Sequence, residues 1–269
     1  MARALAAALL LALLAPAGAI EAQTGGYVQG AATAPDEPQP DGSGRSAGDP
    51  WEPFNRKIFG FNETLDRYAL EPIATGWDTV MPRRVETCIE NFFVNLQMPV
   101  RMANDLLQGK PWKAYETAWR IVVYTTVGIG GLFDPASAWQ IYKSEEDFGQ
   151  TLGVWGTPPG PYLVLPLLGP SSPRDATGLA VDAAATFPVT WYLIPMYVTV
   201  PARSVDIVNR RALALETIRE ERKAAFDWYA AVRSAWTQYR ENQVNDRAEA
   251  PKEPEATDEE DLYGFDEDE

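Results

Sequence analysis

The sequence predicts an all-α protein: a single helical domain with one loop rich in glycine and proline, and with disordered ends. Two observations lead to this prediction. Apolar residues recur at spacings of three and four in several segments, which is the period of an amphipathic helix. Glycines and prolines in residues 147–175 forbid a long helix, yet Leu163 to Leu168 is almost wholly apolar, so this loop must lie against a core, a lipid or a bilayer edge.

Residues 1–19 are expected to be an export signal. Arg3 supplies a positive charge, the run from Leu5 to Ala15 is apolar, and Ala17-Gly18-Ala19 resembles a cleavage site. The apolar run is shorter than a spanning anchor needs, which is roughly 20 residues. Residues 20–48 are mostly small or polar and are expected to form a disordered linker.

The domain is expected to occupy residues 49–245 and to begin with an amphipathic helix. Pro53 suits a first helical turn. The apolar stripe that follows consists of Phe54, Ile58, Phe61, Leu65 and Tyr68. Phe59 lies off this stripe, so the helix is apolar on a second side, which suggests contact with lipid or a partner.

Two more helices are predicted in the first half of the chain. Pro82 opens one of them, Pro99 is expected to restart it, and Gly109 ends it. The other runs from about Trp112 to Val127. The segment 121–133 carries no charge, and its glycine-rich end suggests a turn or a half-inserted hairpin.

The second half of the chain is also predicted to be helical. A helix should start at the N-cap Ser172, with Pro173 in its first position, and end near Ala185. Residues 187–202 are uncharged, aromatic and broken by prolines, so an interfacial segment and a buried connector fit equally well. From residue 202 to about 243 the chain is charged and helical again.

Composition excludes several classes of function. The net charge of −15 belongs mainly to residues 251–269, with ten acids and one lysine, whereas residues 51–250 carry 20 bases and 23 acids. No basic stripe is available for nucleic acid. The chain has no histidine and one cysteine, Cys88, so it cannot build a Ser-His-Asp triad, a Cys-His pair or a His-based zinc site. We predict no enzyme, no metal and no cofactor, although composition leaves a carboxylate pair possible.

Several motifs in order resemble the MlaA/VacJ family. They are DPWEPFNR and FGFN at 49–56 and 59–62, GGLFD at 130–134, FGQTLG at 148–153, and GPYLVLP with RD at 160–166 and 174–175. The resemblance covers roughly residues 49–240. It implies an all-helical ring in the inner leaflet of the outer membrane, with an amphipathic channel through which misplaced outer-leaflet phospholipids pass toward the periplasm.

The resemblance also implies partners, namely a porin trimer in the membrane and a periplasmic lipid-carrier protein that accepts the phospholipid. The alternative function is an envelope adaptor that docks porins without transporting lipid; a phospholipase is an enzymatic rival. Family members are typically lipoproteins with an acylated Cys directly after the signal, whereas Ala19 and Ile20 stand here. Apolar helix faces and the porin contact would then hold the protein on the periplasmic face.

The family motifs also nominate site residues. Phe59, Gly60, Phe61 and Asn62 are expected to help set how open the channel is, because a mid-helix glycine suggests close packing or a soft point. The loop 153–170 is expected to form the channel rim. Its residues are Trp155 and Tyr162 at headgroup level, Leu163, Leu165, Leu167 and Leu168 at the tails, and Arg174 and Asp175 as a local ion pair or a phosphate contact.

The acidic tail, residues 246–269, has two interpretations. The first is a solvated extension without a role. The second rests on Leu262, Tyr263 and Phe265, which lie among the acids and suggest a short motif that docks the lipid carrier.

Overall fold

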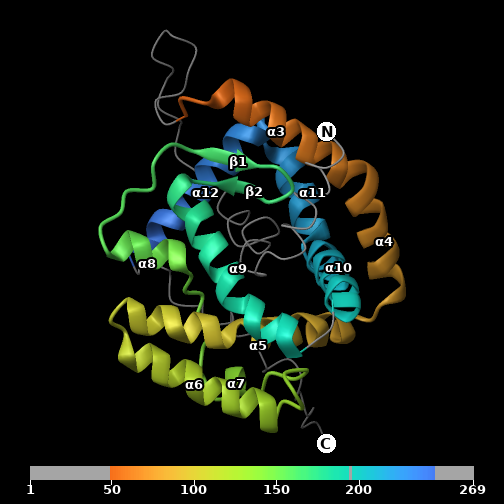
Figure 1. Ribbon diagram of the computed structural model, residues 1–269. Helices are drawn as coiled ribbons and strands as arrows, with labels where there is room; N and C mark the ends of the chain where they lie inside the picture. Colours follow the sequence, from red (N-terminus) through yellow and green to blue (C-terminus); the bar gives the residue numbers. More distant parts are fainter. Residues whose placement is uncertain (1–48, 194–195, 246–269) are drawn as a thin grey trace, which may run out of the picture.

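The structure, a computed structural model, describes residues 49–193 and 196–245. Its helices follow one another around a central region, so that the ribbon has the form of a ring (Figure 1). The prediction of an all-α fold is confirmed, since the strands of the described residues form only one short hairpin. The predicted signal, the linker and the tail residues Leu262, Tyr263 and Phe265 lie outside the described residues.

The elements follow the chain in a simple order. They are α3 (Glu52–Leu65), the π-helical turn η2 (Asp66–Leu70), α4 (Glu71–Val80), α5 (Arg83–Leu107), α6 (Pro111–Thr126), α7 (Pro135–Ala138), α8 (Phe148–Val154), β1 (Leu163–Leu165), β2 (Gly169–Ser171), α9 (Pro173–Leu193), α10 (Met196–Leu213), α11 (Leu215–Ala224) and α12 (Trp228–Val244). The helices α3, η2 and α4 run on without a break and form one arc on the outside of the ring (Figure 1).

Prolines break fewer helices than the sequence predicts. The predicted restart at Pro99 is wrong, because α5 is continuous through this residue. An interior proline costs about 3 kcal/mol, but Val94, Met98 and Arg101 on both sides of it are buried against neighbouring elements, and this packing outweighs the lost hydrogen bond. Helix α9 likewise runs to Leu193, beyond its predicted end, and α10 contains Pro201.

A close approach of two helices fixes the wall formed by α8 and α9. A Cβ atom added to Gly178 of α9 would lie 2.2 Å from the backbone nitrogen of Gly149 in α8. Only glycine allows the two backbones to approach this closely. The glycines of the motif at 148–153 therefore serve helix packing.

Long-range polar contacts close the ring between its first and last helices. The hydroxyl of Tyr229 donates to the carboxylate of Asp49, and the guanidinium of Arg56 lies 2.7 Å from the carboxylate of Asp227. Further along the arc, Arg211 of α10 binds Asp66 of η2 at 2.8 Å. These contacts tie the arc of α3, η2 and α4 to the C-terminal helices.

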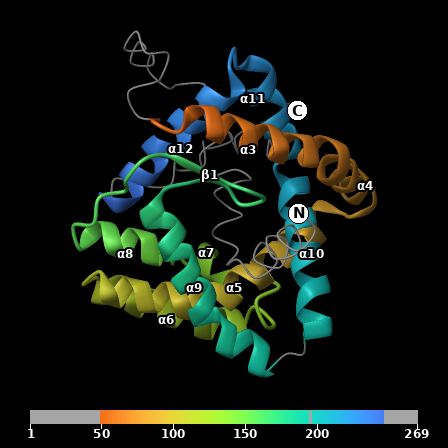
Figure 2. The same cartoon turned by 45° about the horizontal axis from the view of Figure 1, so that its top comes forward.

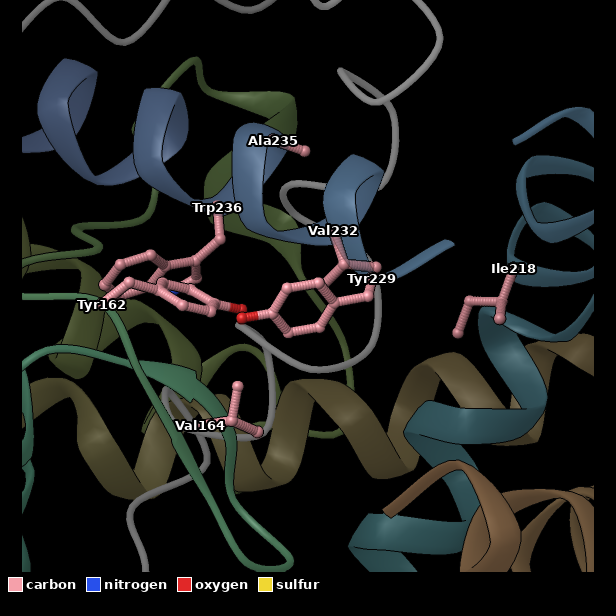
Figure 3. Close-up of a cluster of buried hydrophobic side chains, with 7 residues drawn as sticks. All are labelled: Tyr162, Val164, Ile218, Tyr229, Val232, Ala235 and Trp236. Carbon is pink, nitrogen blue, oxygen red and sulfur yellow. The ribbon is translucent and has the colours of Figure 1, made fainter. Parts of the chain in front are cut away.

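The main apolar core lies where α12 covers the hairpin. Its members are Tyr162, Val164, Ile218, Tyr229, Val232, Ala235 and Trp236 (Figure 3). The rings of Tyr162 and Trp236 meet edge to face, with centroids 5.5 Å apart. Views from two directions place the hairpin on the inner side of α3 (Figures 1 and 2). The hairpin is thus held between α3 and α12.

Candidate functional site

Two asparagines of α3 fasten the hairpin to the inside of the ring. Asn55 donates to the carbonyl oxygen of Tyr162 and accepts from the N–H of Val164, both at 3.0 Å. Asn62 donates to the carbonyl of Leu165 at 3.0 Å and accepts from the N–H of Leu167 at 2.9 Å. The two side chains are seven residues apart and therefore share one face of the helix. They hold the apolar loop against the ring by its backbone.

The turn of the hairpin is conformationally strained. Leu167 has a φ of 67°, in the left-handed region that costs a residue with a Cβ about 1–2 kcal/mol. The hydrogen bond from its N–H to Asn62 helps to hold this conformation. This gives Asn62, one of the predicted site residues, a definite role in shaping the loop.

A cavity of about 100 Å³ lies beside the hairpin. The apolar part of its lining includes Leu165, Leu168, Leu179 and Trp236. The polar and charged part of the lining, called the polar wall below, includes Gln97, Arg101, Glu145, Glu146, Asp147, Asp175, Asp182, Arg240 and Gln243. One water needs about 10–15 Å³ of such space, so the cavity has room for several waters or one small polar group.

Arg240 of α12 organises the polar wall. Its guanidinium lies 2.6 Å from Asp147 and 2.7 Å from Asp175, and it therefore bridges the start of α8 to the start of α9. Burial alone would raise the pKa of Asp147, but the charge of Arg240 overrides it and holds this pKa below its ordinary value. Asp147 also caps α8, accepting from the N–H of Gln150 at 2.8 Å. The guanidinium of Arg240 thus forms ion pairs with two carboxylates.

Asp182 of α9 is a different kind of carboxylate. Its side chain is held by hydrogen bonds from Asn104 at 3.1 Å and from the backbone N–H of Phe148 at 2.9 Å. Only 6% of the residue is exposed, and this burial raises its pKa to about 6. No lysine or arginine of the described residues lies within ion-pair distance of it. Its negative charge therefore faces the cavity without a direct counter-ion.

Three of the predicted site residues line this cavity: Leu165, Leu168 and Asp175. The predicted pair of Arg174 and Asp175 is present at 3.1 Å. Leu163 and Leu167 are half-buried beside them in the hairpin.

Other predicted site residues lie elsewhere. Tyr162 was expected at headgroup level, and this is corrected: it is 5% exposed and packs between Tyr229 and Trp236 in the core (Figure 3). Trp155 is exposed, and its indole N–H donates to the carbonyl of Leu107 at 3.0 Å. Neither residue lines the cavity.

The four residues 59–62 separate into inward and outward positions. Phe59 packs on Tyr229 with ring centroids 5.4 Å apart, and Asn62 holds the hairpin. Phe61 is exposed. Gly60 is exposed too, and a Cβ there would meet nothing within 4 Å, so close packing does not explain this glycine. A soft point in the helix stays a prediction.

Most residues of the polar wall are not among the predicted site residues. Gln97, Arg101, Asn104 and Asp105 recur at spacings of four, three and one, so they form a polar stripe along α5. All four are buried. This polar stripe on an amphipathic helix was the sequence signal for the polar wall. It gave no indication of a cavity, because a helix face exposed to solvent has the same pattern. Among the described residues, no cluster of acids and Cys88 has the makeup of a metal site.

The outside of the ring is unusually apolar. On α6, the exposed residues Trp112, Tyr115, Trp119 and Val122 follow one another at spacings of three and four, so they share one face. The next turn adds Ile129, Leu132 and Phe133, and α3 to α4 add Phe54, Phe61, Leu65, Tyr68 and Ile73. Patches of this extent mark contact with protein or membrane. None of the described helices has the length and apolar character needed to cross a bilayer.

Comparison with known proteins gives consistent results. A family model described as "MlaA lipoprotein" matches residues 47–243. The chain is 36% identical over 200 residues to an "Uncharacterized protein" of Rickettsia bellii (strain RML369-C), covering 74% of this chain and 78% of that protein. It is 36% identical over 201 residues to the "Intermembrane phospholipid transport system lipoprotein MlaA" of Haemophilus influenzae, covering 74% and 80%.

The protein of the same description from Escherichia coli (strain K12) is 34% identical over 203 residues, which is 74% of this chain and 78% of that protein. A solved structure described as "Structural basis for maintenance of bacterial outer membrane lipid asymmetry" is similar with a TM-score of 0.64. Its sequence identity is 32%, and the match covers 75% of this chain and 100% of that chain.

Proposed function

Because this chain belongs to the MlaA lipoprotein family, we propose that it is a phospholipid conduit of the outer membrane. The family takes part in intermembrane phospholipid transport and in outer-membrane lipid asymmetry. In this role the protein removes mislocalised phospholipids from the outer leaflet and passes them to a periplasmic carrier. It does so at the periplasmic side of the membrane, next to a porin trimer.

The observation that carries this proposal is the inverted distribution of polarity. Large apolar side chains cover much of the outside, while the inner wall between α5, α8, α9 and α12 is rich in buried charged and amide groups. A water-soluble protein normally has the opposite arrangement. Polar groups that face inward, away from an apolar exterior, are typical of proteins that carry polar cargo through a lipid environment.

The cavity supplies both kinds of surface that a phospholipid needs. Leu165 and Leu168 of the hairpin offer an apolar surface to the acyl tails, and the polar wall around Arg240 offers hydrogen bonds and charges to the headgroup. Since Asn55 and Asn62 hold the hairpin by its backbone, the leucine side chains are left to face the cargo. The protein acts by passage and not by catalysis.

Photo-crosslinking tests whether lipid occupies this site. A photoreactive residue placed at position 165, in cells that express the full chain, is expected to capture phospholipid. The matched control is position 237, because Thr237 is exposed on α12 directly after the cavity residue Trp236. Capture at 165 with little capture at 237 supports a lipid path through the cavity.

Two outcomes would contradict the proposal. If position 165 crosslinks only to protein, the hairpin serves core packing and does not contact lipid. If positions 165 and 237 capture lipid equally, the crosslinks report general contact with the membrane. A docking adaptor without transport should also leave no phospholipid in the purified protein. Expression in an Escherichia coli strain without its own MlaA should lower surface-exposed phospholipid if the chain transports lipid.

A further inference from the structure

The cavity lining contains more carboxylates than guanidinium groups, although Lys110 and Lys113 pair with Glu146 from outside the lining. Five carboxylates line the cavity, those of Glu145, Glu146, Asp147, Asp175 and Asp182, against the two guanidinium groups of Arg101 and Arg240. Arg240 is shared between Asp147 and Asp175, and Arg174 also lies 3.1 Å from Asp175, so these two guanidinium groups balance the two carboxylates. Asp182 adds a charge that has no direct counter-ion. An anion brought next to Asp182 would therefore meet repulsion at short range.

Two buried atoms on the polar wall lack a hydrogen-bond partner among the described residues. Glu146 is 4% exposed; its Oε1 atom binds Lys110 and Lys113, whereas its Oε2 atom has no donor. Arg240 is 9% exposed, and its Nε–H has no acceptor. Such groups are costly in a protein interior unless a ligand or a water satisfies them. One is an acceptor that suits an ammonium N–H, and the other is a donor that suits a phosphate oxygen.

We propose that the cavity selects phospholipids with a zwitterionic headgroup that carries a primary ammonium, as in phosphatidylethanolamine, over phospholipids with a net negative headgroup. The ammonium is held by the carboxylates of Asp182 and Glu146, and the phosphate meets the edge of Arg240. The headgroup adds no net charge next to Asp182, and it brings both an N–H donor and an oxygen acceptor. This inference rests on the proposed function and names its substrate class.

The fixed position of Asp182 explains why the cavity should prefer a headgroup with an ammonium over an anionic headgroup. The carboxylate of Asp182 is fixed by Asn104 and by the N–H of Phe148, so it does not need to reorganise to receive a cation. An anionic headgroup such as phosphatidylglycerol offers hydroxyl groups in place of the ammonium. It would leave the charge of Asp182 uncompensated while adding its own.

The test uses the full chain in vesicles of equal parts phosphatidylethanolamine and phosphatidylglycerol. The protein is extracted in mild detergent, and its bound phospholipid is identified by mass spectrometry. We expect the bound fraction to be enriched in phosphatidylethanolamine by about fivefold over the vesicle composition, and Asp182→Asn to bring the ratio close to that of the vesicles. The matched control is Asp78→Asn, a carboxylate on α4 that does not line the cavity.

The outcomes separate this inference from the proposed function. Bound lipid with the composition of the vesicles, or enriched in phosphatidylglycerol, overturns the inference and leaves lipid passage standing. A protein that binds no phospholipid overturns both. If Asp182→Asn fails to fold, as judged by its thermal transition, Glu146→Gln takes its place, and an unchanged preference in that folded variant overturns the inference.

Discussion

The buried carboxylate of Asp182 contributes to the pH dependence of the stability of the protein. Its pKa of about 6 lies above the ordinary value of 3.8, because burial disfavours the charged form more than its hydrogen bonds favour it. The folded protein therefore holds a proton on this group in a range where the unfolded chain has released it. As pH rises from about 4 to above 6, the folded state becomes less stable relative to the unfolded state through this residue.

Asp182→Asn should remove this dependence. The shift corresponds to about 3 kcal/mol in the free energy of unfolding, at 1.36 kcal/mol for each pKa unit. As pH rises from 4 to 7.5, the free energy of unfolding of the variant should therefore increase relative to that of the wild type, by up to about 3 kcal/mol. Asp147 faces the same cavity and interacts with the charge of Asp182, so the measured difference includes this interaction.

Thermal unfolding of both proteins in the same detergent, at several pH values, measures this effect. The control variant Asp78→Asn should follow the pH profile of the wild type. A constant difference between Asp182→Asn and the wild type across this range would show that the carboxylate titrates normally.

At the scale of elements, α8 and α9 approach each other so closely that their backbones are in contact at Gly149 and Gly178, with no side chain between them. Gly178→Ala would place a methyl group 2.2 Å from the backbone nitrogen of Gly149, and backbone cannot move aside as a flexible side chain can. We expect a loss of about 1–3 kcal/mol or more in the free energy of unfolding, together with a displaced Asp182.

The matched control is Gly76→Ala in α4, where a Cβ would meet nothing within 4 Å. Here alanine is expected to stabilise the helix by about 0.5–1 kcal/mol, because glycine loses more backbone entropy on folding. In chemical denaturation, the midpoint of Gly178→Ala should therefore fall below that of the wild type, and the midpoint of Gly76→Ala should rise above it. Equal tolerance of both substitutions would mean that α8 and α9 are not in close contact.

The elements also show which predictions a sequence can support. Helix α6 was predicted at 112–127 and observed at 111–126, since its apolar period and the flanking Pro111 and Gly109 are local signals. The N-cap Ser172 was predicted for the same reason and accepts from the N–H of Asp175 at 3.1 Å. These features need no knowledge of distant residues.

The polar wall and the burial of Tyr162 could not be predicted in this way. Arg240 meets Asp147 across 93 positions of the chain and Asp175 across 65. A polar stripe such as that of α5 becomes a cavity wall only because other helices cover it. Pro99 was misjudged for the same reason, since contacts on both of its sides hold the helix together.

At the scale of the whole molecule, the apolar outside predicts a membrane contact through α6. Trp112 is 71% exposed and Trp119 is 49% exposed on the same face. Burying an apolar side chain of this size is worth about 1.5–3 kcal/mol. We therefore expect Trp119→Glu to lower the partition of the full chain into vesicles by about tenfold, since 1.4 kcal/mol corresponds to a factor of ten.

Co-sedimentation with vesicles measures this partition. The control is Gln238→Glu, which adds the same charge at an exposed and already polar position of α12. A loss for both variants would point to a general charge effect, and no loss for Trp119→Glu would assign the α6 face to a protein partner.

The contacts made by Asp49, Arg56 and Asn55 affect how the protein folds during its synthesis. Their partners Tyr229, Asp227 and Tyr162 follow them by 180, 171 and 107 positions. During synthesis, α3 can be fixed by these contacts only after nearly the whole chain has been made, and contacts of such long range form slowly. In this interval the exposed apolar side chains of α3 and α6 make the incompletely folded chain prone to aggregation.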